Sequence, residues 1–137
     1  MDYDDRFIEA FETLIFKMQQ VDATCQQAYG DVSKREFNLL IMLGKSEKMI
    51  VREVADFLGI PVSSATAIID KLSEKGYLRR IHSSSDRRII VVVLSQEGKS
   101  IYLSLTSKMK NFARGVMDKL GEAEKKKLVQ LLEKAAA

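Results

Sequence analysis

The stretch VREVADFLGIPVSSATAIIDKLSEKGYLRRIHSSSDRRIIVVVL, residues 51–94, decides the fold of this 137-residue chain. Its first part, residues 51–75, has the spacing of a helix-turn-helix, in which Gly59-Ile60-Pro61 separates two helical segments. Its second part, residues 78–94, contains two apolar, β-branched runs around a polar Ser-Ser-Ser-Asp turn, which predicts a β-hairpin. The two parts together predict a helix-turn-helix with a hairpin directly behind it.

Small and apolar residues occupy the positions at which two crossing helices meet. Counted from Val51, Ala55 is the fifth residue, and Gly59 is the ninth, where the turn requires a positive φ. The positions that hold the two helices together carry Val54, Leu58, Ile60, Ala65 and Ile68. Val51 departs from the pattern, because a Ser or Thr would be a better N-cap at its position. A plain helical hairpin with a glycine turn fits the same residues, so this pattern alone leaves both interpretations open.

The second helix of such a motif presents its N-terminal residues to base edges in the DNA major groove. The exposed candidates for DNA binding are Ser63, Ser64, Thr66, Ala67 and Lys71. Ser63 could equally serve as a helix cap. Asp70 would repel phosphate, so we expect it to orient a neighbouring base such as Lys71. This face has no Arg, Asn or Gln for the strongest base pairings, which predicts modest direct readout supplemented by DNA shape.

The hairpin is rich in arginine. Its candidate DNA-binding residues are Arg79, Arg80, His82, Arg87 and Arg88, and Asp86 is the single acid among them. A solvated hairpin tip would also tolerate such a charge run. However, arginine is the residue favoured in narrow minor grooves, and this hairpin directly follows the candidate recognition helix. The hairpin is therefore interpreted as a DNA-binding wing.

The rest of the chain is predicted to be helical. A helix over residues 4–29 carries a seam with steps of four and three: Phe7, Phe11, Leu14, Met18, Val21, Cys25 and Ala28. Such a seam is typical of a helix that packs against a partner helix. Ser33 and Glu36 form a capping box for a buried helix over residues 34–43, with a loop at residues 44–48. Further helices are expected over residues 52–58, 62–75, 95–120 and 122–137, giving a mainly α fold with a small β-hairpin wing.

Composition and charge exclude several classes of protein. Hydrophobic residues make up 46% and charged residues 30% of the chain, as expected for one globular domain. No apolar run is long enough for a membrane span, and the acidic start is no secretory signal, so a cytoplasmic protein is expected. One cysteine and one histidine cannot form a zinc site, and no catalytic motif or cofactor loop is present, so an enzyme is not expected. Residues 1–30 carry a net charge of −4 and residues 61–94 carry +3, which suits a polyanionic partner for the middle of the chain.

The chain resembles the MarR family of bacterial winged-helix regulators. The resemblance is strongest in Val54-Ala55, Leu58-Gly59, residues 72–80 (LSEKGYLRR), Asp86-Arg87-Arg88 and residues 93–98 (VLSQEG). It implies a homodimer built by residues 1–30 and 95–137, around a winged-helix lobe over residues 33–94 with its helix-turn-helix at 51–75 and wing at 78–94. It also implies double-stranded DNA as partner, with pseudo-palindromic operators and usually repression. Arg88 matches the minor-groove arginine of the family, and Asp86 matches the acid that holds it.

The chain departs from the family at two positions. Ala67 stands where many members carry Arg or Lys, and Val51 stands where many carry Ser or Thr, which affects the expected operator sequence. The resemblance further implies release from DNA by a small ligand or by oxidation. Cys25 is the candidate redox sensor, although its apolar seam favours a buried structural cysteine. A ligand pocket could be lined by Phe16, Met18, Phe37 and Met42, which also fit core positions. A winged-helix protein–protein adaptor without DNA binding is the alternative function.

Overall fold

The computed structural model contains six helices and one two-stranded sheet. It describes the backbone of all 137 residues, and the side chains of residues 1–20 and 29–137. The chain divides into two compact units. One unit comprises residues 1–22 and 107–137, and the other comprises residues 23–106. The α5 helix (Gln96–Met117) contributes residues to both units, as does α1 (Tyr3–Ala28).

The unit of residues 23–106 contains the hydrophobic core. Its elements are α2 (Lys34–Ser46), α3 (Val51–Leu58), α4 (Val62–Glu74), β1 (Leu78–His82), β2 (Ile90–Leu94) and the start of α5. The largest fully buried side chains are those of Leu39, Leu40, Leu43, Val54, Ile69, Leu72, Val92 and Ile101. They come from every one of these elements except β1, so the helix-turn-helix, the hairpin and the first turns of α5 share one core.

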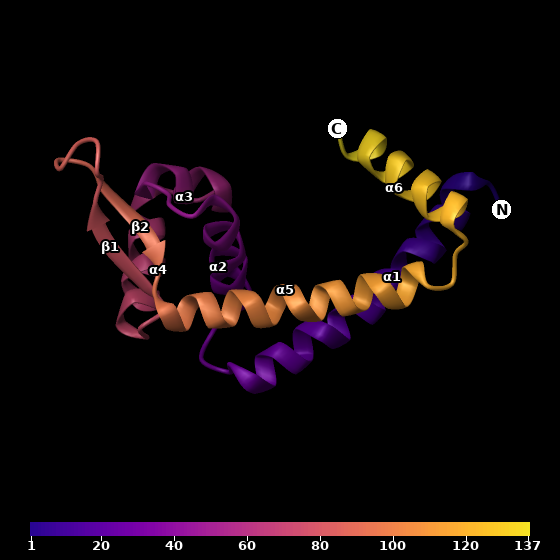
Figure 1. Cartoon of the computed structure of the whole chain (residues 1–137), viewed down its shortest axis with the longest axis horizontal. Helices are drawn as coiled ribbons and strands as arrows, with labels where there is room; N and C mark the ends of the chain where they lie inside the picture. Colours follow the sequence, from indigo (N-terminus) through magenta and orange to yellow (C-terminus); the bar gives the residue numbers. More distant parts are fainter. The chain divides into compact units, whose positions relative to one another are not determined.

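The predicted hairpin is present as the antiparallel pair of β1 and β2. Its register pairs Leu78 with Leu94 at one end and His82 with Ile90 at the other. A bridge from Met49 to Val92 adds a second line of pairing, on the side of β2 away from β1. The turn between the strands projects beyond the helices of this unit (Figure 1). The sheet therefore anchors the base of the hairpin in the core and leaves the arginine-rich tip in solvent.

The turn of the helix-turn-helix follows the sequence prediction. Gly59 has a φ of 66°, in the left-handed region that disfavours a side chain, and it ends α3. The interpretation of Val51 as an N-cap was wrong: the N-cap is Ile50, whose N–H donates to the Glu53 carboxylate at 2.9 Å. Glu53, three residues after the cap, supplies one half of a capping box, because its carboxylate accepts from the N–H of the N-cap residue, whereas no side chain caps the first N–H groups of the helix.

The α2 helix is longer than predicted. Its capping box is confirmed, because the Glu36 N–H donates to the Ser33 hydroxyl at 3.2 Å and the Ser33 N–H to Glu36 at 3.3 Å. The predicted loop at residues 44–48 was wrong in part, since the helix continues through Gly44 to Ser46. Leu43 is fully buried there, and its packing holds the last turn helical despite the glycine.

The other unit contains the first part of α1, the end of α5, and α6 (Glu122–Ala136). Among its described side chains none belongs to the buried core. Its exposed large hydrophobic residues include Phe7, Ile8, Phe11, Leu14, Phe16, Val129, Leu131 and Leu132. The first four predicted seam residues are thus half-exposed or exposed, and Val21, Cys25 and Ala28 lie outside the described side chains. No described helix is both long and apolar enough to cross a bilayer.

Candidate nucleic-acid interface

The exposed face of α4 carries most of the residues proposed to read bases. Ser63, Ser64, Ala67 and Lys71 are exposed, and Thr66 is half-buried. The N-cap is Pro61, without a side-chain cap, so Ser63 lies inside the first turn and does not cap the helix. The Thr66 hydroxyl donates to the Val62 carbonyl at 3.0 Å, which leaves its oxygen as an acceptor. The face therefore offers two free hydroxyls, two methyl groups and one ammonium.

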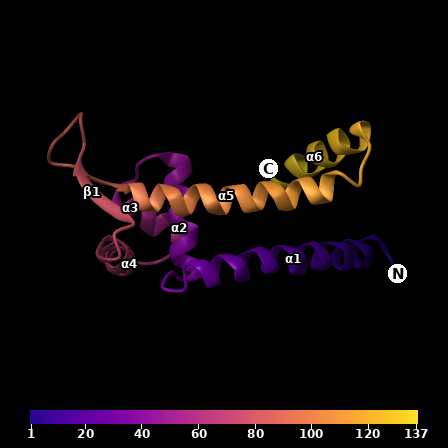
Figure 2. The same cartoon turned by 60° about the horizontal axis from the view of Figure 1, so that its bottom comes forward.

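Asp70 forms an ion pair with Arg80 of β1. The expectation that Asp70 orients Lys71 was wrong, because the carboxylate turns toward the strand instead. Figure 2 views α4 nearly end-on beside the start of β1, the arrangement that brings these two side chains together. The side chains of both residues remain partly exposed, at 53% for Asp70 and 35% for Arg80. The pair joins the recognition helix to the wing and occupies one of the arginines that the sequence suggested for DNA.

The two arginines at the base of the wing lie on opposite faces of the hairpin. Side chains alternate along a strand, so Arg79 and Arg80 point away from each other. Arg80 is paired in register with the buried Val92 and reaches α4, whereas Arg79 is paired with Val93. Arg79 is exposed and lies beside α2 and α5 rather than α4.

The tip of the wing is held by Asp86. Its carboxylate accepts from Arg88 Nε and Nη2, both at 3.2 Å, and from the Arg88 backbone N–H at 3.0 Å. These hydrogen bonds from Arg88 lower the pKa of the Asp86 carboxyl below its usual value. The Arg88 side chain is 91% exposed, so the pair fixes its direction without burying it. A guanidinium presented in this way suits a narrow groove with a high negative potential.

His82 braces the same turn. Its Nδ1 lies 2.7 Å from the Arg87 carbonyl oxygen, which can only accept, so Nδ1 carries the proton and donates. The Ser83 N–H donates to the Ile89 carbonyl at 2.8 Å and closes the hairpin next to it. Arg87 itself is exposed, and its side chain forms no hydrogen bond or ion pair with the described residues. His82 thus serves the shape of the wing, and its Nε2 is left for an external partner.

The C-terminal end of α4 is anchored by a cluster that the sequence did not reveal. Lys75 donates to the Asp31 carbonyl and forms an ion pair with Glu36 at 3.1 Å. Glu36 is buried, with 5% of its surface exposed. Tyr77 donates to the Asp31 carboxylate at 3.4 Å, and burial, followed by this neighbouring charge, raises the pKa of the tyrosine. The cluster fixes the recognition helix to the start of α2.

Cys25 is the candidate redox residue, and Phe16, Met18, Phe37 and Met42 are the residues predicted to line a ligand pocket. Cys25 lies outside the residues whose side chains are described. Phe37 is buried and packs edge-on against Tyr29 with ring centroids 6.5 Å apart, so it belongs to the core. Met42 packs against that core, and Phe16 is 63% exposed. Among the described residues, no cluster of three or more His, Cys, Asp or Glu could hold a metal ion.

Comparison with known proteins connects this geometry to a family. A sequence model described as the MarR family matches residues 32–90. The HTH-type transcriptional regulator YpoP of Bacillus subtilis, itself uncharacterised, is 31% identical over 104 residues, covering 76% of this chain and 74% of YpoP. The chain belongs to the MarR family. Its members here are transcriptional regulators rather than enzymes.

Two further comparisons define how far the likeness extends. The uncharacterised regulator YfiV of Bacillus subtilis is 32% identical over 78 residues, covering 57% of this chain, and the match spans about half of YfiV, 49% of its length. The crystal structure of Streptococcus pneumoniae FabT in complex with DNA superposes with a TM-score of 0.77. It is 23% identical and the match covers 98% of this chain and 95% of FabT, so it shows that the two chains share a fold.

Proposed function

We propose that this MarR-family protein binds duplex DNA as a homodimer, at a pseudo-palindromic operator, and represses transcription there. The observation that carries this proposal is the presentation of Arg88, which is almost fully exposed and oriented by Asp86 at the tip of a projecting wing. The wing would enter the minor groove while the first turns of α4 enter the adjacent major groove. FabT of Streptococcus pneumoniae, which has the same fold, was crystallised with DNA.

The side chains on α4 favour limited direct base readout. Ser63, Ser64 and Ala67 can contribute hydrogen bonds and a methyl contact, but none offers a bidentate pairing with a base. Arg80 is held by Asp70 rather than extended from the surface. DNA shape and phosphate contacts would therefore supply much of the affinity, with a strong dependence on salt.

The exposed seam supports the homodimer. Phe7, Phe11 and Leu14 expose 61%, 48% and 38% of their surfaces, and the unit that contains them has no buried core among its described side chains. Apolar area of this extent on a helix is stabilised by a partner helix. Isologous pairing would place two recognition helices about one DNA turn apart, roughly 34–36 Å, which matches a palindromic site.

Because the operator is unidentified, the test begins with selection of bound duplexes from a random library. Fluorescence anisotropy on a selected duplex then compares the protein with Arg88→Ala. We expect the variant to lose about tenfold or more in affinity, and the slope of log affinity against log salt to fall by about one unit per wing. Arg114→Ala, which removes an exposed arginine of α5 outside the wing, is the matched control.

Two outcomes would contradict the proposal. Unchanged DNA affinity in Arg88→Ala would remove the wing from the interface. Absence of duplex binding even at low salt would favour the protein–protein adaptor instead. If oxidation is the signal for release, peroxide should release DNA from the unmodified protein but not from the Cys25→Ser variant. Release of DNA from both proteins would exclude Cys25 as the redox sensor.

A further inference from the structure

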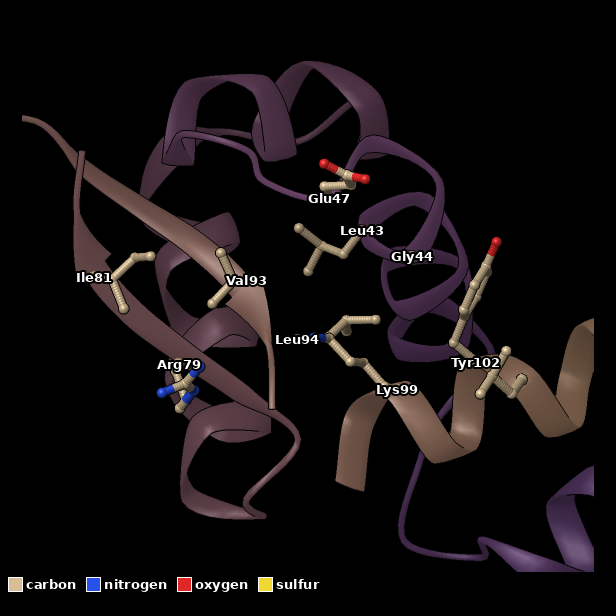
Figure 3. A pocket seen from close by; sticks show the side chains of 10 residues that line it. Leu43, Gly44, Glu47, Arg79, Ile81, Val93, Leu94, Lys99 and Tyr102 are labelled. Atoms are coloured by element: carbon tan, nitrogen blue, oxygen red, sulfur yellow. The ribbon is translucent and has the colours of Figure 1, made fainter. Parts of the chain in front are cut away.

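A hollow of about 490 Å³ lies within the unit of residues 23–106, and no residue of α4 lines it. Its walls come from the C-terminal end of α2, both strands, and the first turns of α5 (Figure 3). The residues that matter for its chemistry are Leu43, Glu47, Arg79, Val93, Lys99 and Tyr102. None of them belongs to the ligand pocket that the sequence suggested. The volume is within the range of small-molecule sites.

Three charged side chains around this hollow have no partner in the protein. Ion pairs elsewhere hold Asp70, Arg80, Asp86 and Arg88, but no described side chain forms an ion pair or hydrogen bond with the side chains of Glu47, Arg79 or Lys99. All three are exposed. Unpaired charges that line one concave site are available to a ligand, because pairing them with one another is not required for the fold.

The charges are arranged by sign. In Figure 3, Glu47 lies at one end of the hollow, whereas Arg79 and Lys99 lie toward the other end. Val93 lies between them and supplies an apolar wall together with the exposed Ile81 and Leu103, and the Tyr102 ring forms the side contributed by α5. A second hollow shares Arg79 and Lys99 and continues to Ser95 at the start of α5. Glu97 in the first turn of α5 also lines this second hollow, so its charge opposes the attraction of the helix N-terminus for an anion, and Arg79 and Lys99 are the two cations there.

We propose that this hollow binds a small ω-amino carboxylate, a molecule with a carboxylate and an ammonium group separated by an apolar chain. Arg79 and Lys99 would bind the carboxylate, and Glu47 would accept from the ammonium. The apolar chain of the ligand would pack on Val93, Ile81 and Leu103. A simple fatty anion would leave the Glu47 carboxylate against an alkyl end without a donor, which is unfavourable. A dicarboxylate would place a second negative charge there.

The position of the hollow connects it to the DNA interface, and this regulatory half of the inference rests on the proposed function. Arg79 precedes Arg80, which pairs with Asp70 on the recognition helix. A ligand that draws Arg79 toward α5 acts on the same short strand that sets the wing relative to α4. Occupancy of the hollow is therefore expected to change DNA affinity, by the factor by which the ligand's affinity differs between the DNA-bound and the free protein.

The binding test uses 6-aminohexanoate as the probe, with hexanoate and hexylamine as analogues that each lack one charged end. Isothermal titration calorimetry on the full chain should give a Kd on the order of 1 mM for 6-aminohexanoate. Each analogue should bind about fivefold more weakly or worse, since it leaves one charged group of the protein without a partner. Hexanoate binding as tightly as 6-aminohexanoate would overturn the role of Glu47.

Two variants locate the probe. Lys99→Gln should lower the affinity for 6-aminohexanoate and for hexanoate alike, by about fivefold. Glu47→Gln should lower the affinity for 6-aminohexanoate by a similar factor and leave the affinity for hexanoate unchanged, because only 6-aminohexanoate has an ammonium group. Lys110→Gln, an exposed lysine farther along α5, is the control and should leave both unchanged. No binding of 6-aminohexanoate up to about 20 mM, or equal binding to Lys99→Gln, would overturn the site.

The regulatory half has its own readout. Anisotropy on a selected duplex, with the probe at saturation, should show a change in DNA affinity of about threefold or more. Calorimetric binding with unchanged DNA affinity would overturn the coupling and leave the site standing. Loss of all duplex binding, with the probe still bound, would count against the proposed function and the coupling together, and not against the site.

Discussion

At the scale of single residues, the wing depends on a pair that contributes little to stability. Asp86 and Arg88 are two residues apart, and the arginine side chain is 91% exposed. Ion pairs in this setting contribute little to the free energy of unfolding, because water screens them. The pair is therefore best understood as setting the direction of Arg88 before DNA arrives, which lowers the entropy lost on binding.

Asp86→Asn tests this interpretation. The amide keeps the shape of the side chain but loses its charge, so Arg88 should sample more directions and DNA affinity should fall about two- to fivefold. The melting temperature should stay unchanged. Anisotropy and thermal denaturation measure the two effects, with Asp118→Asn as an exposed control. A drop in melting temperature equal to that of a core variant would show that the pair is structural instead.

The direction of the Asp86 pKa shift predicts where this effect is lost. Because Arg88 lowers the pKa in the folded protein, the carboxylate remains charged below the pH at which an unfolded chain would protonate it. The ion pair is present above the usual aspartate pKa and disappears only as pH falls through the lowered value. DNA affinity should accordingly show no contribution from Asp86 titration at neutral pH.

At the scale of elements, α5 begins in close contact with the end of α4. The Ser95 hydroxyl donates to the Gly76 carbonyl at 2.6 Å and accepts from the Gly98 N–H at 3.0 Å. A Cβ built at Gly98 would lie 2.1 Å from the Tyr77 carbonyl oxygen, a backbone atom that cannot move aside. The Leu-Ser-x-x-Gly pattern of the sequence thus has a steric cause.

Gly98→Ala should destabilise the fold by about 2 kcal/mol, because overpacking here forces the backbone apart. Gly115→Ala on the same helix is the matched control, since a Cβ there meets no atom of the described residues within 4 Å. The control should hold or raise stability by up to about 1 kcal/mol through its helix propensity. Urea unfolding measures both variants. Equal behaviour of the two would contradict the contact at Gly98.

Lys75 provides a second prediction at this scale. Lys75→Met would leave Glu36 buried without its cation and should destabilise the protein by about 3 kcal/mol. Adding Glu36→Leu should recover part of the loss, because the unpaired buried carboxylate is removed with it. Urea denaturation of the two single variants and the double variant measures the coupling. Purely additive losses would show that the two side chains act independently.

Sequence reasoning reached the local features and missed the contacts between elements. Gly59, the hairpin and the capping box at Ser33 follow from short-range rules, and Arg88 and Asp86 followed from a family motif. The Asp70–Arg80 pair joins a helix to a strand, and the partner of Asp70 was assigned to the wrong neighbour because only adjacent residues could be weighed. The hollow beside Glu47 and Lys99 has no sequence signal, since its walls come from segments about 50 residues apart in the chain.

At the scale of the whole molecule, burial is distributed unequally. The unit of residues 23–106 has a complete core, whereas the described side chains of the other unit include none that is buried. Phe7 and Phe11 stack with ring centroids 5.3 Å apart on the exposed seam of α1. Apolar surface of this kind is stabilised when a second chain covers it.

Phe11→Glu should convert the protein to a monomer, because a charge at the centre of an apolar seam must be buried on association. Sedimentation velocity should show half the mass, and DNA affinity should fall by about tenfold or more as the paired sites are lost. Thr13→Glu, on another face of the same helix, should remain dimeric. A dimeric Phe11→Glu would place the interface elsewhere.

The alternation of side chains along β1 has a consequence for how such a regulator can diverge. Arg80 pairs with the recognition helix and His82 contacts the wing tip, whereas Arg79 and Ile81 line the hollow. Substitutions in one set leave the other in place, so a change of signal molecule need not disturb the choice of operator. An inserted residue has the opposite effect, since it exchanges the two faces and alters both properties at once.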